Sequence, residues 1–336
     1  MPPAEQYGYS VARLRAMSGR LLEESLIQRV LESDDLETAV KVLGETSYVQ
    51  WLGEQKGTLD FDRVIENELV HGYDEVQKFV PDARLVQICR LPYDFHNVKV
   101  LLKSLILAKE GGERRFDLLT PLGNIDRDVL ITAMETEEYR LLPFGLHRAV
   151  PEALALWEQT KDALVMEKSL DRALFEAMGN LARETNIEAA VQWVRGRIDA
   201  ENIRNLLRLK RLDIDPSDVG SFLHAGGLIS KEKLLSLLPE PVESWGRSLS
   251  FSEVGDAFSH VEDSSDLSTL VVRMERLLDE YIFSVLEESK FGAFEPGYVL
   301  SFLWKKEMEA KNLRIAMVSV ANDTDRSMAK GLLRHV

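Results

Sequence analysis

Three stretches of the sequence carry the same set of polar side chains at the same spacing. Each has an acid, an asparagine three residues later, and a cation two residues after that, followed by apolar residues. A carboxylate, an amide and a cation can act together in acid–base catalysis, so one catalytic set per copy is the first hypothesis to weigh. The sets are Asp94, Asn97 and Lys99; Asp199, Asn202 and Arg204; and Glu309, Asn312 and Arg314.

Helical geometry favours a packing role for the asparagine. Residues four apart share a helix face, and the residues four before and four after each asparagine are apolar or aromatic. The amide is therefore predicted to be buried, where it must be hydrogen-bonded. His96 occurs in the first copy only, which argues against a catalytic role shared by all three.

The cation of each copy points elsewhere. Two residues along a helix correspond to a turn of about 200°, which directs it away from the asparagine. Lys99, Arg204 and Arg314 are therefore possible partner-facing residues or residues between lobes, and three solvated helix cations are the open alternative.

Two further patterns recur in the same order. The first is a glycine that begins a similar short segment in each copy, at Gly19, Gly123 and Gly227. The second is an acid–arginine pair, which occurs as Asp62-Arg63, Asp171-Arg172 and Glu275-Arg276. Such self-similarity indicates three diverged copies of a unit of about 105 residues. Because both halves recur, the motif acids Asp94, Asp199 and Glu309 are predicted to pair with Arg63, Arg172 and Arg276.

The elements that position these residues are predicted to be helices. No regular β-branched alternation bounded by turn pairs is found, so the fold class is all-α, with roughly fifteen to twenty helices. The motifs are expected on helices over 85–108, 187–212 and 298–320, the first entered through Pro92. One long helix is expected over 151–180. The predicted lobes are residues 1–108, 109–213 and 214–336.

Composition excludes several classes of function. The 336-residue chain has a net charge of −15, which argues against a nucleic-acid partner or an anionic membrane surface. No uncharged apolar run is long enough to span a bilayer. The single cysteine, Cys89, excludes a disulfide framework and fits a reducing compartment. Glu68 and His71 form one Glu-x-x-His without a second, so no metal is predicted. The sequence has neither a Gly-x-x-x-x-Gly-Lys phosphate loop nor a Gly-x-Gly-x-x-Gly, so no cofactor is predicted.

The motif copies, together with the opening run Tyr7–Arg15 and Arg20-Leu21-Leu22, resemble the C subunits of bacterial and archaeal V-type (A-type) ATPases, relatives of the eukaryotic d subunit. The resemblance implies a funnel of three pseudo-threefold helical lobes around a central cavity, without enzymatic activity of its own. It implies a central rotor component that couples the central stalk, built from the D and F subunits, to the membrane proteolipid (c/K) ring. It also implies a cytoplasmic place, peripheral to the inner (plasma) membrane.

Two alternatives stay open at this point. One is a helical scaffold that binds other soluble partners. The other is an enzyme, which would need an unrepeated polar cluster in one lobe, and only His96 hints at that. Neither the direction of ATP turnover nor the choice of proton or sodium follows from the sequence.

Overall fold

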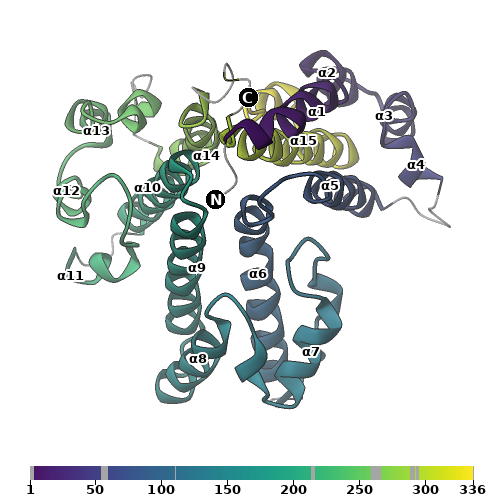
Figure 1. Cartoon of the computed structure of the whole chain (residues 1–336). Coiled ribbons are helices and arrows are strands. Elements are labelled where there is room, and N and C mark those ends of the chain that lie inside the picture. Colours follow the sequence, from purple (N-terminus) through teal and green to yellow (C-terminus); the bar gives the residue numbers. More distant parts are fainter. Residues whose placement is uncertain are drawn as a thin grey trace. The chain divides into compact units, whose positions relative to one another are not determined.

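The structure is a computed structural model that describes residues 4–53, 60–109, 111–212, 216–258, 266–287, 292 and 295–335. Throughout these ranges the regular elements are α-helices and short 3-10 helices, with no β-strand among them (Figure 1). The predicted all-α fold class is therefore confirmed.

The chain divides into two compact units. One combines Met1–Asp82 with Ile187–Val336, and the other is Ala83–Asn186. These units break the chain at points other than the predicted lobe boundaries, so the division into 1–108, 109–213 and 214–336 stays a prediction.

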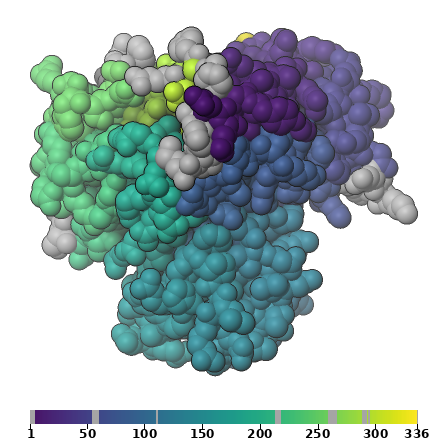
Figure 2. All heavy atoms as spheres, viewed as in Figure 1, coloured from purple at the N-terminus to yellow at the C-terminus, as the bar shows by residue number. Residues whose placement is uncertain are grey.

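The unit Ala83–Asn186 is built around one long helix pair. Helix α6 packs along α9, and α8 packs against α9 as well (Figure 1). Side chains fill the space between the ribbons of α6 and α9 (Figure 2). The elements are α6 (Arg84–Lys109), η2 (Phe116–Leu118), α7 (Arg127–Glu135), η3 (Tyr139–Leu141), α8 (Leu146–Thr160) and α9 (Ala163–Thr185).

The other unit contains two long helix pairs of the same kind. Helix α10 packs along α14, and α15 packs along α5 while also contacting α1, α2 and α3. The elements are η1 (Ala4–Tyr7), α1 (Gly8–Ser18), α2 (Glu24–Leu31), α3 (Leu36–Leu43), α4 (Val49–Leu52), α5 (Phe61–Gln77), α10 (Glu188–Arg211), α11 (Pro216–Val219), η4 (Gly220–Phe222), α12 (Lys231–Ser236), α13 (Val242–Ser248), η5 (Glu253–Phe258), α14 (Leu267–Ser284), α15 (Gly297–Ala321) and α16 (Arg326–Lys330).

The helix predicted over 151–180 is wrong, because two helices occupy this region. Lys161 ends α8 in the left-handed conformation, with φ of 54°. The Asp162 side chain then accepts a hydrogen bond from the backbone N–H of Leu164 at 2.8 Å, which caps α9. An aspartate that caps a helix start stabilises this break, although neither glycine nor proline marks it.

The predicted entrance of the first motif helix is also wrong. Pro92 lies inside α6, which begins eight residues earlier at Arg84. Leu85, Val86 and Ile88 in this first part of α6 are fully buried. Their burial outweighs the backbone hydrogen bond that a proline removes from a helix interior.

Candidate functional site

Each motif asparagine forms the same two-way bridge to a backbone segment that follows it in the chain. Its side-chain amide donates to a backbone carbonyl, and its side-chain oxygen accepts from the N–H of that same residue. The bridges are Asn97 with Thr120 (2.9 and 2.9 Å), Asn202 with His224 (3.0 and 2.7 Å) and Asn312 with Arg334 (2.9 and 2.8 Å). Asn97 and Asn202 are fully buried and Asn312 is half-buried. Each amide therefore satisfies both polar groups of one loop residue.

The motif acids hold the backbone a few residues beyond the glycine register. The Asp94 carboxylate accepts from the N–H of Ile125 at 2.9 Å and from the Asn124 amide at 2.7 Å. The Asp199 carboxylate accepts from the N–H groups of Leu228 and Ile229 at 2.8 and 3.1 Å. Burial raises the pKa of Asp94 and of Asp199 to about 6, although these hydrogen bonds oppose the shift.

The third motif acid reaches a segment from the other end of the sequence. Glu309 accepts from the N–H of Leu22 at 2.6 Å, from the Tyr48 hydroxyl at 2.7 Å and from Lys306 Nζ at 2.7 Å. Leu22 lies three residues after Gly19. The third motif acid therefore also binds backbone just beyond a glycine of the repeat, although that glycine lies near the other end of the sequence.

Close approach of the acid explains two of the three glycines. A Cβ atom added to Gly123 would lie 2.5 Å from Asp94 Oδ1, and one added to Gly227 would lie even closer to Asp199 Oδ1. At Gly19 the nearest atom would be the Ala16 carbonyl oxygen at 3.5 Å, which is an ordinary contact. Gly123 and Gly227 therefore leave room for the carboxylate, whereas no carboxylate of the described residues lies against Gly19.

Each motif cation pairs with the acid of the acid–arginine register on the helix packed beside it. Lys99 on α6 pairs with Asp171 on α9. The other two pairs are Arg204 Nε with Glu275 at 2.8 Å, joining α10 to α14, and Arg314 Nε with Asp62 at 2.7 Å, joining α15 to α5. All three long helix pairs thus share one ion pair at an equivalent place.

The motif acids were predicted to pair with Arg63, Arg172 and Arg276, and one of these three pairs is absent. The pair of Glu309 with Arg276 does not form, because Glu309 is bonded to Lys306 and Arg276 pairs with Glu280 at 3.3 Å. Arg63 and Asp94 belong to different compact units, as do Arg172 and Asp199, so these two pairings stay predictions.

Two arginines that were not predicted complete the first and second copies. Arg90 donates to the carbonyl of Gly123 at 3.3 Å, and Arg195 donates to the carbonyl of Gly227 at 3.4 Å. Each lies four residues before a motif acid, a shared offset that was visible in the sequence. The third copy has Lys305 at this offset, which lies over the ring of Phe283.

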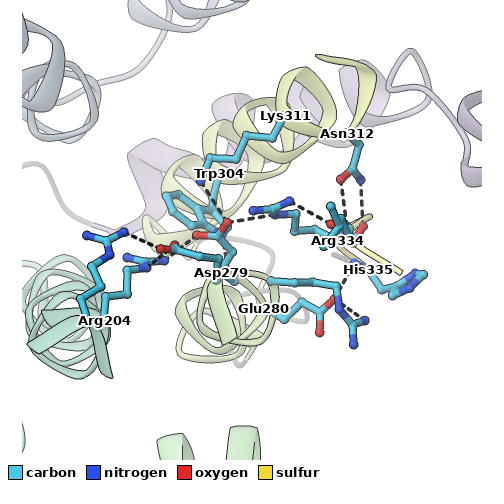
Figure 3. Close-up of polar contacts among 12 residues, drawn as sticks. Arg204, Asp279, Glu280, Trp304, Lys311, Asn312, Arg334 and His335 are labelled. Atoms are coloured by element: carbon cyan, nitrogen blue, oxygen red, sulfur yellow. Dashed lines mark hydrogen bonds and ion pairs between the residues drawn. The ribbon is translucent and has the colours of Figure 1, made fainter. Parts of the chain in front are cut away.

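An unpredicted carboxylate, Asp279 on α14, collects three cations (Figure 3). Its side chain is 2% exposed and contacts Arg204, Lys311 and Arg334 at 2.8, 3.0 and 3.0 Å. Burial would raise the pKa of Asp279, but the charges of Lys311, Arg204 and Arg334 outweigh it and hold the pKa below its usual value. The cluster ties α10, α14, α15 and the segment after α16 together.

A second buried cluster surrounds Lys306 on α15. Its ammonium contacts Glu309 at 2.7 Å and Glu68 of α5 at 2.9 Å, and Glu68 also accepts from the Trp51 indole at 2.8 Å. His71 packs edge-on against Trp51 rather than beside a second metal ligand. Across the described ranges, no group of three or more His, Cys, Asp or Glu residues is placed to hold a metal ion.

These contacts define what the arrangement does chemically. The amides, carboxylates and cations of the three motifs bind backbone loops and neighbouring helices, so they fix α6, α10 and α15 against their partners. Satisfied buried polar networks of this kind specify one packing arrangement and make slippage costly.

Comparison with known proteins identifies the family. Residues 10–332 match the model of the ATP synthase (C/AC39) subunit. The chain belongs to this family. The resemblance to the C subunits seen in the sequence is thereby confirmed, and with it the likeness to components of A-type and V-type ATP synthases.

Individual members of the family match over almost the whole chain. The C subunit of the V-type sodium ATPase of Enterococcus hirae is 24% identical over 327 residues, which cover 96% of each chain. The C subunit of the V-type ATP synthase of Thermus thermophilus is 27% identical, covering 93% of each chain. The C subunit of the A-type ATP synthase of Methanocaldococcus jannaschii is 24% identical, covering 92% of this chain and 81% of the relative. None of the helices in the described part of this chain has the length and apolar character that crossing a bilayer requires.

Proposed function

We propose that this chain is the C subunit of a V-type or A-type rotary ATPase, and that it couples the central stalk to the membrane proteolipid ring. The observation that supports this most strongly is the family match over residues 10–332, with relatives named as the C subunits of such complexes. In this proposal the chain is a non-catalytic part of the rotor and binds no cofactor. ATP-linked transport of protons or sodium is a property of the whole complex.

The internal geometry supports a mechanical role. A coupling element must transmit torque between two surfaces without changing its own packing. Each long helix pair is held by an ion pair to its neighbour, and each motif helix by an asparagine bridge to a loop. Because hydrogen bonds and ion pairs depend on the direction and distance of their partners, they resist sliding of one helix along the other better than apolar contacts alone.

The proposed partners are the D and F subunits of the stalk on one side and the proteolipid ring on the other. The funnel of three lobes with a central cavity is the arrangement that we propose would receive the stalk. The chain would lie on the cytoplasmic side, peripheral to the membrane. Its net charge of −15 favours partner surfaces that carry basic residues, with docking that weakens as salt is added.

Among the three motif cations, Arg314 is the most accessible candidate for a partner contact. Its side chain is 46% exposed, against 23% for Lys99 and 13% for Arg204. We propose that Lys99 and Arg204 act mainly on their own helix pairs, and that Arg314 can face a partner.

The test is a bridging experiment with purified components. The immobilised D–F pair should retain detergent-solubilised proteolipid ring only when this chain is added, and less of it as salt rises. Binding of the chain to the D–F pair but not to the ring, or to the ring but not to the D–F pair, would contradict the coupling role. Binding to neither would favour a scaffold for other partners. Arg314→Ser, with Arg29→Ser as an exposed control, then tests the accessible motif cation.

A further inference from the structure

In the third motif copy the asparagine and the acid bind two separate segments, unlike in the other two copies. In the first two copies, one continuous loop supplies both the asparagine partner and the carboxylate partner, as Thr120–Ile125 and His224–Ile229. In the third copy, Asn312 binds Arg334, whereas Glu309 binds Leu22. The partner of Asn312 therefore belongs to a separate segment, Asp325–His335, which is called the strap below.

The strap ends in a set of directional polar contacts (Figure 3). Its Arg334 backbone forms the two-way bridge with Asn312, and its guanidinium Nε lies 3.0 Å from Asp279. The N–H of His335 donates to Glu280 Oε1 at 2.9 Å, and its imidazole lies 3.6 Å from Glu24. The groups that bind the strap, Asn312, Asp279, Glu280 and Glu24, come from helices α15, α14 and α2 and are called its seat below.

These contacts match the recognition of an arginine-bearing peptide. An amide that pairs with both polar groups of one residue fixes the backbone, and a buried carboxylate selects the guanidinium beside it. Two acidic groups, Glu280 on α14 and Glu24 on α2, contact the next residue, His335. The strap thus occupies its seat as a peptide ligand occupies a site.

The strap holds few apolar anchors. Within Asp325–His335 only Ala329 and Leu333 are buried apolar residues, whereas Met328 is 70% exposed. By contrast, α1 and α2 bury apolar side chains such as Leu14, Val30 and Leu31. Since apolar burial dominates the free-energy cost of detaching a segment, we expect the strap to detach more easily than α1 or α2.

Release of the strap strands no charge in the interior. Asp279 keeps Arg204 and Lys311 at 2.8 and 3.0 Å when Arg334 leaves. Glu280 keeps Arg276 at 3.3 Å. Asn312 is half-buried, so water can replace its lost partners.

We propose that Asp325–His335 is a releasable strap, and that Asp279, Glu280, Asn312 and Glu24 form a peptide site selective for an arginine-bearing segment, which the strap fills in cis. The site is a property of this chain alone and does not depend on the coupling role proposed above.

The test separates the strap from its seat. A chain ending at Thr324 lacks the strap, and a synthetic peptide of residues 325–336 supplies it in trans. The shortened chain is expected to keep its helical circular dichroism and to bind the peptide saturably in a fluorescence-anisotropy titration. Substitution of Arg334→Ala in the peptide, or Asn312→Ala in the chain, should weaken binding at least tenfold. A Met328→Ala peptide is the matched control and should bind unchanged. The full chain, whose site is filled, should bind little peptide.

Hydrogen exchange on the full chain provides an independent measurement. Asn312→Ala should speed amide exchange in residues 325–335 at least tenfold and leave α10 and α12 unchanged. The matched variant Asn202→Ala should instead act on the loop His224–Ile229. The proposal is overturned if the shortened chain is folded yet binds no peptide, or binds the Arg334→Ala peptide equally well. Global unfolding of both the shortened chain and Asn312→Ala would also overturn it, because a releasable strap must leave a folded remainder.

Discussion

At the scale of single residues, the length of the motif acid is matched to how closely the carboxylate approaches the glycine of the same copy. Asp94 and Asp199 are short, and each lies directly against a glycine that has no room for a side chain. Glu309 is one methylene longer and reaches Leu22, while Gly19 is uncrowded. From the sequence, the change from aspartate to glutamate looked minor, because side-chain reach cannot be judged without the position of the opposing backbone.

This difference predicts unequal effects of alanine at the three glycines. Gly123→Ala and Gly227→Ala force the carboxylate away from its N–H partners, and each should lower the free energy of unfolding by about 1–3 kcal/mol. Gly19→Ala should change it by less than about 0.5 kcal/mol, because its Cβ would meet only an ordinary contact. Urea unfolding followed by circular dichroism measures all three. Equal losses at the three positions would contradict the close-approach explanation.

The raised pKa of Asp94 predicts a dependence of stability on pH. Its pKa is about 6 in the folded protein and about 4 in the unfolded chain. Between these values the folded state holds a proton that the unfolded state has lost, so the stability contribution of Asp94 falls as pH rises from about 4 to 6 and is constant above that. The free-energy difference between the wild type and Asp94→Asn should therefore change by about 3 kcal/mol across this window. Urea titrations at pH 4.5, 5.5 and 7 measure it, and a difference independent of pH would disprove the assignment.

At the scale of elements, long helices with continuous apolar stripes were predictable and a capped break was not. The motif helix expected over 187–212 is α10, Glu188–Arg211, and the one expected over 298–320 is α15, Gly297–Ala321. Neither glycine nor proline lies between Leu156 and Leu164, so no helix-breaking residue marks the turn at Lys161 in the sequence. The only local signal was Asp162, the capping residue.

The turn at Lys161 predicts a stabilising substitution. Lys161 adopts φ of 54°, where an L side chain costs about 1 kcal/mol and glycine costs nothing. Lys161→Gly should therefore raise the free energy of unfolding by about 0.5–1 kcal/mol, since its exposed ion pair with Glu158 contributes little. Asn186→Gly is the matched control at φ of 55° and should gain less, because asparagine tolerates this conformation. A lower melting temperature for Lys161→Gly would show that the break is held by lysine contacts.

The ion pairs between helices predict a graded series. Arg204 is 13% exposed and its partner Asp279 is 2% exposed, so Arg204→Ser should cost about 3 kcal/mol or more. Arg314 and Asp62 are 46% and 57% exposed, so Arg314→Ser should cost about 0–1 kcal/mol. Thermal unfolding of the two variants decides the order. If Arg314→Ser were the more damaging, burial would not be what decides the strength of these ion pairs.

At the scale of the whole molecule, the sequence revealed that a unit recurs but not which segments of the chain contact each other in each copy. Three ordered registers sufficed to predict equivalent asparagines, because each register is local. The contacts of the third copy join residues far apart in the sequence: Arg314 and Asp62 are separated by 252 positions, and Glu309 and Leu22 by 287. No local pattern encodes such a pairing, so the motif acid was matched with the arginine of the acid–arginine pair instead of with the backbone.

The first copy, by contrast, is contained in one continuous stretch. The compact unit Ala83–Asn186 holds the helix pair α6 and α9, the Asn97–Thr120 bridge and the Lys99–Asp171 ion pair. Its size is close to that of common autonomous domains. All partners of this copy's motif are therefore present without the rest of the chain.

This containment predicts that residues 83–186 fold when expressed alone. The fragment should show helical circular dichroism and a single cooperative thermal transition. Asn97→Ala removes both hydrogen bonds between the Asn97 amide and the Thr120 backbone, so it should lower the free energy of unfolding of the fragment by about 1–3 kcal/mol. Met328→Ala in the full chain, at an exposed position outside this stretch, should change the stability of that chain little. A fragment without a cooperative transition would show that the first copy needs the remainder of the chain, and that the repeat is complete only in the whole molecule.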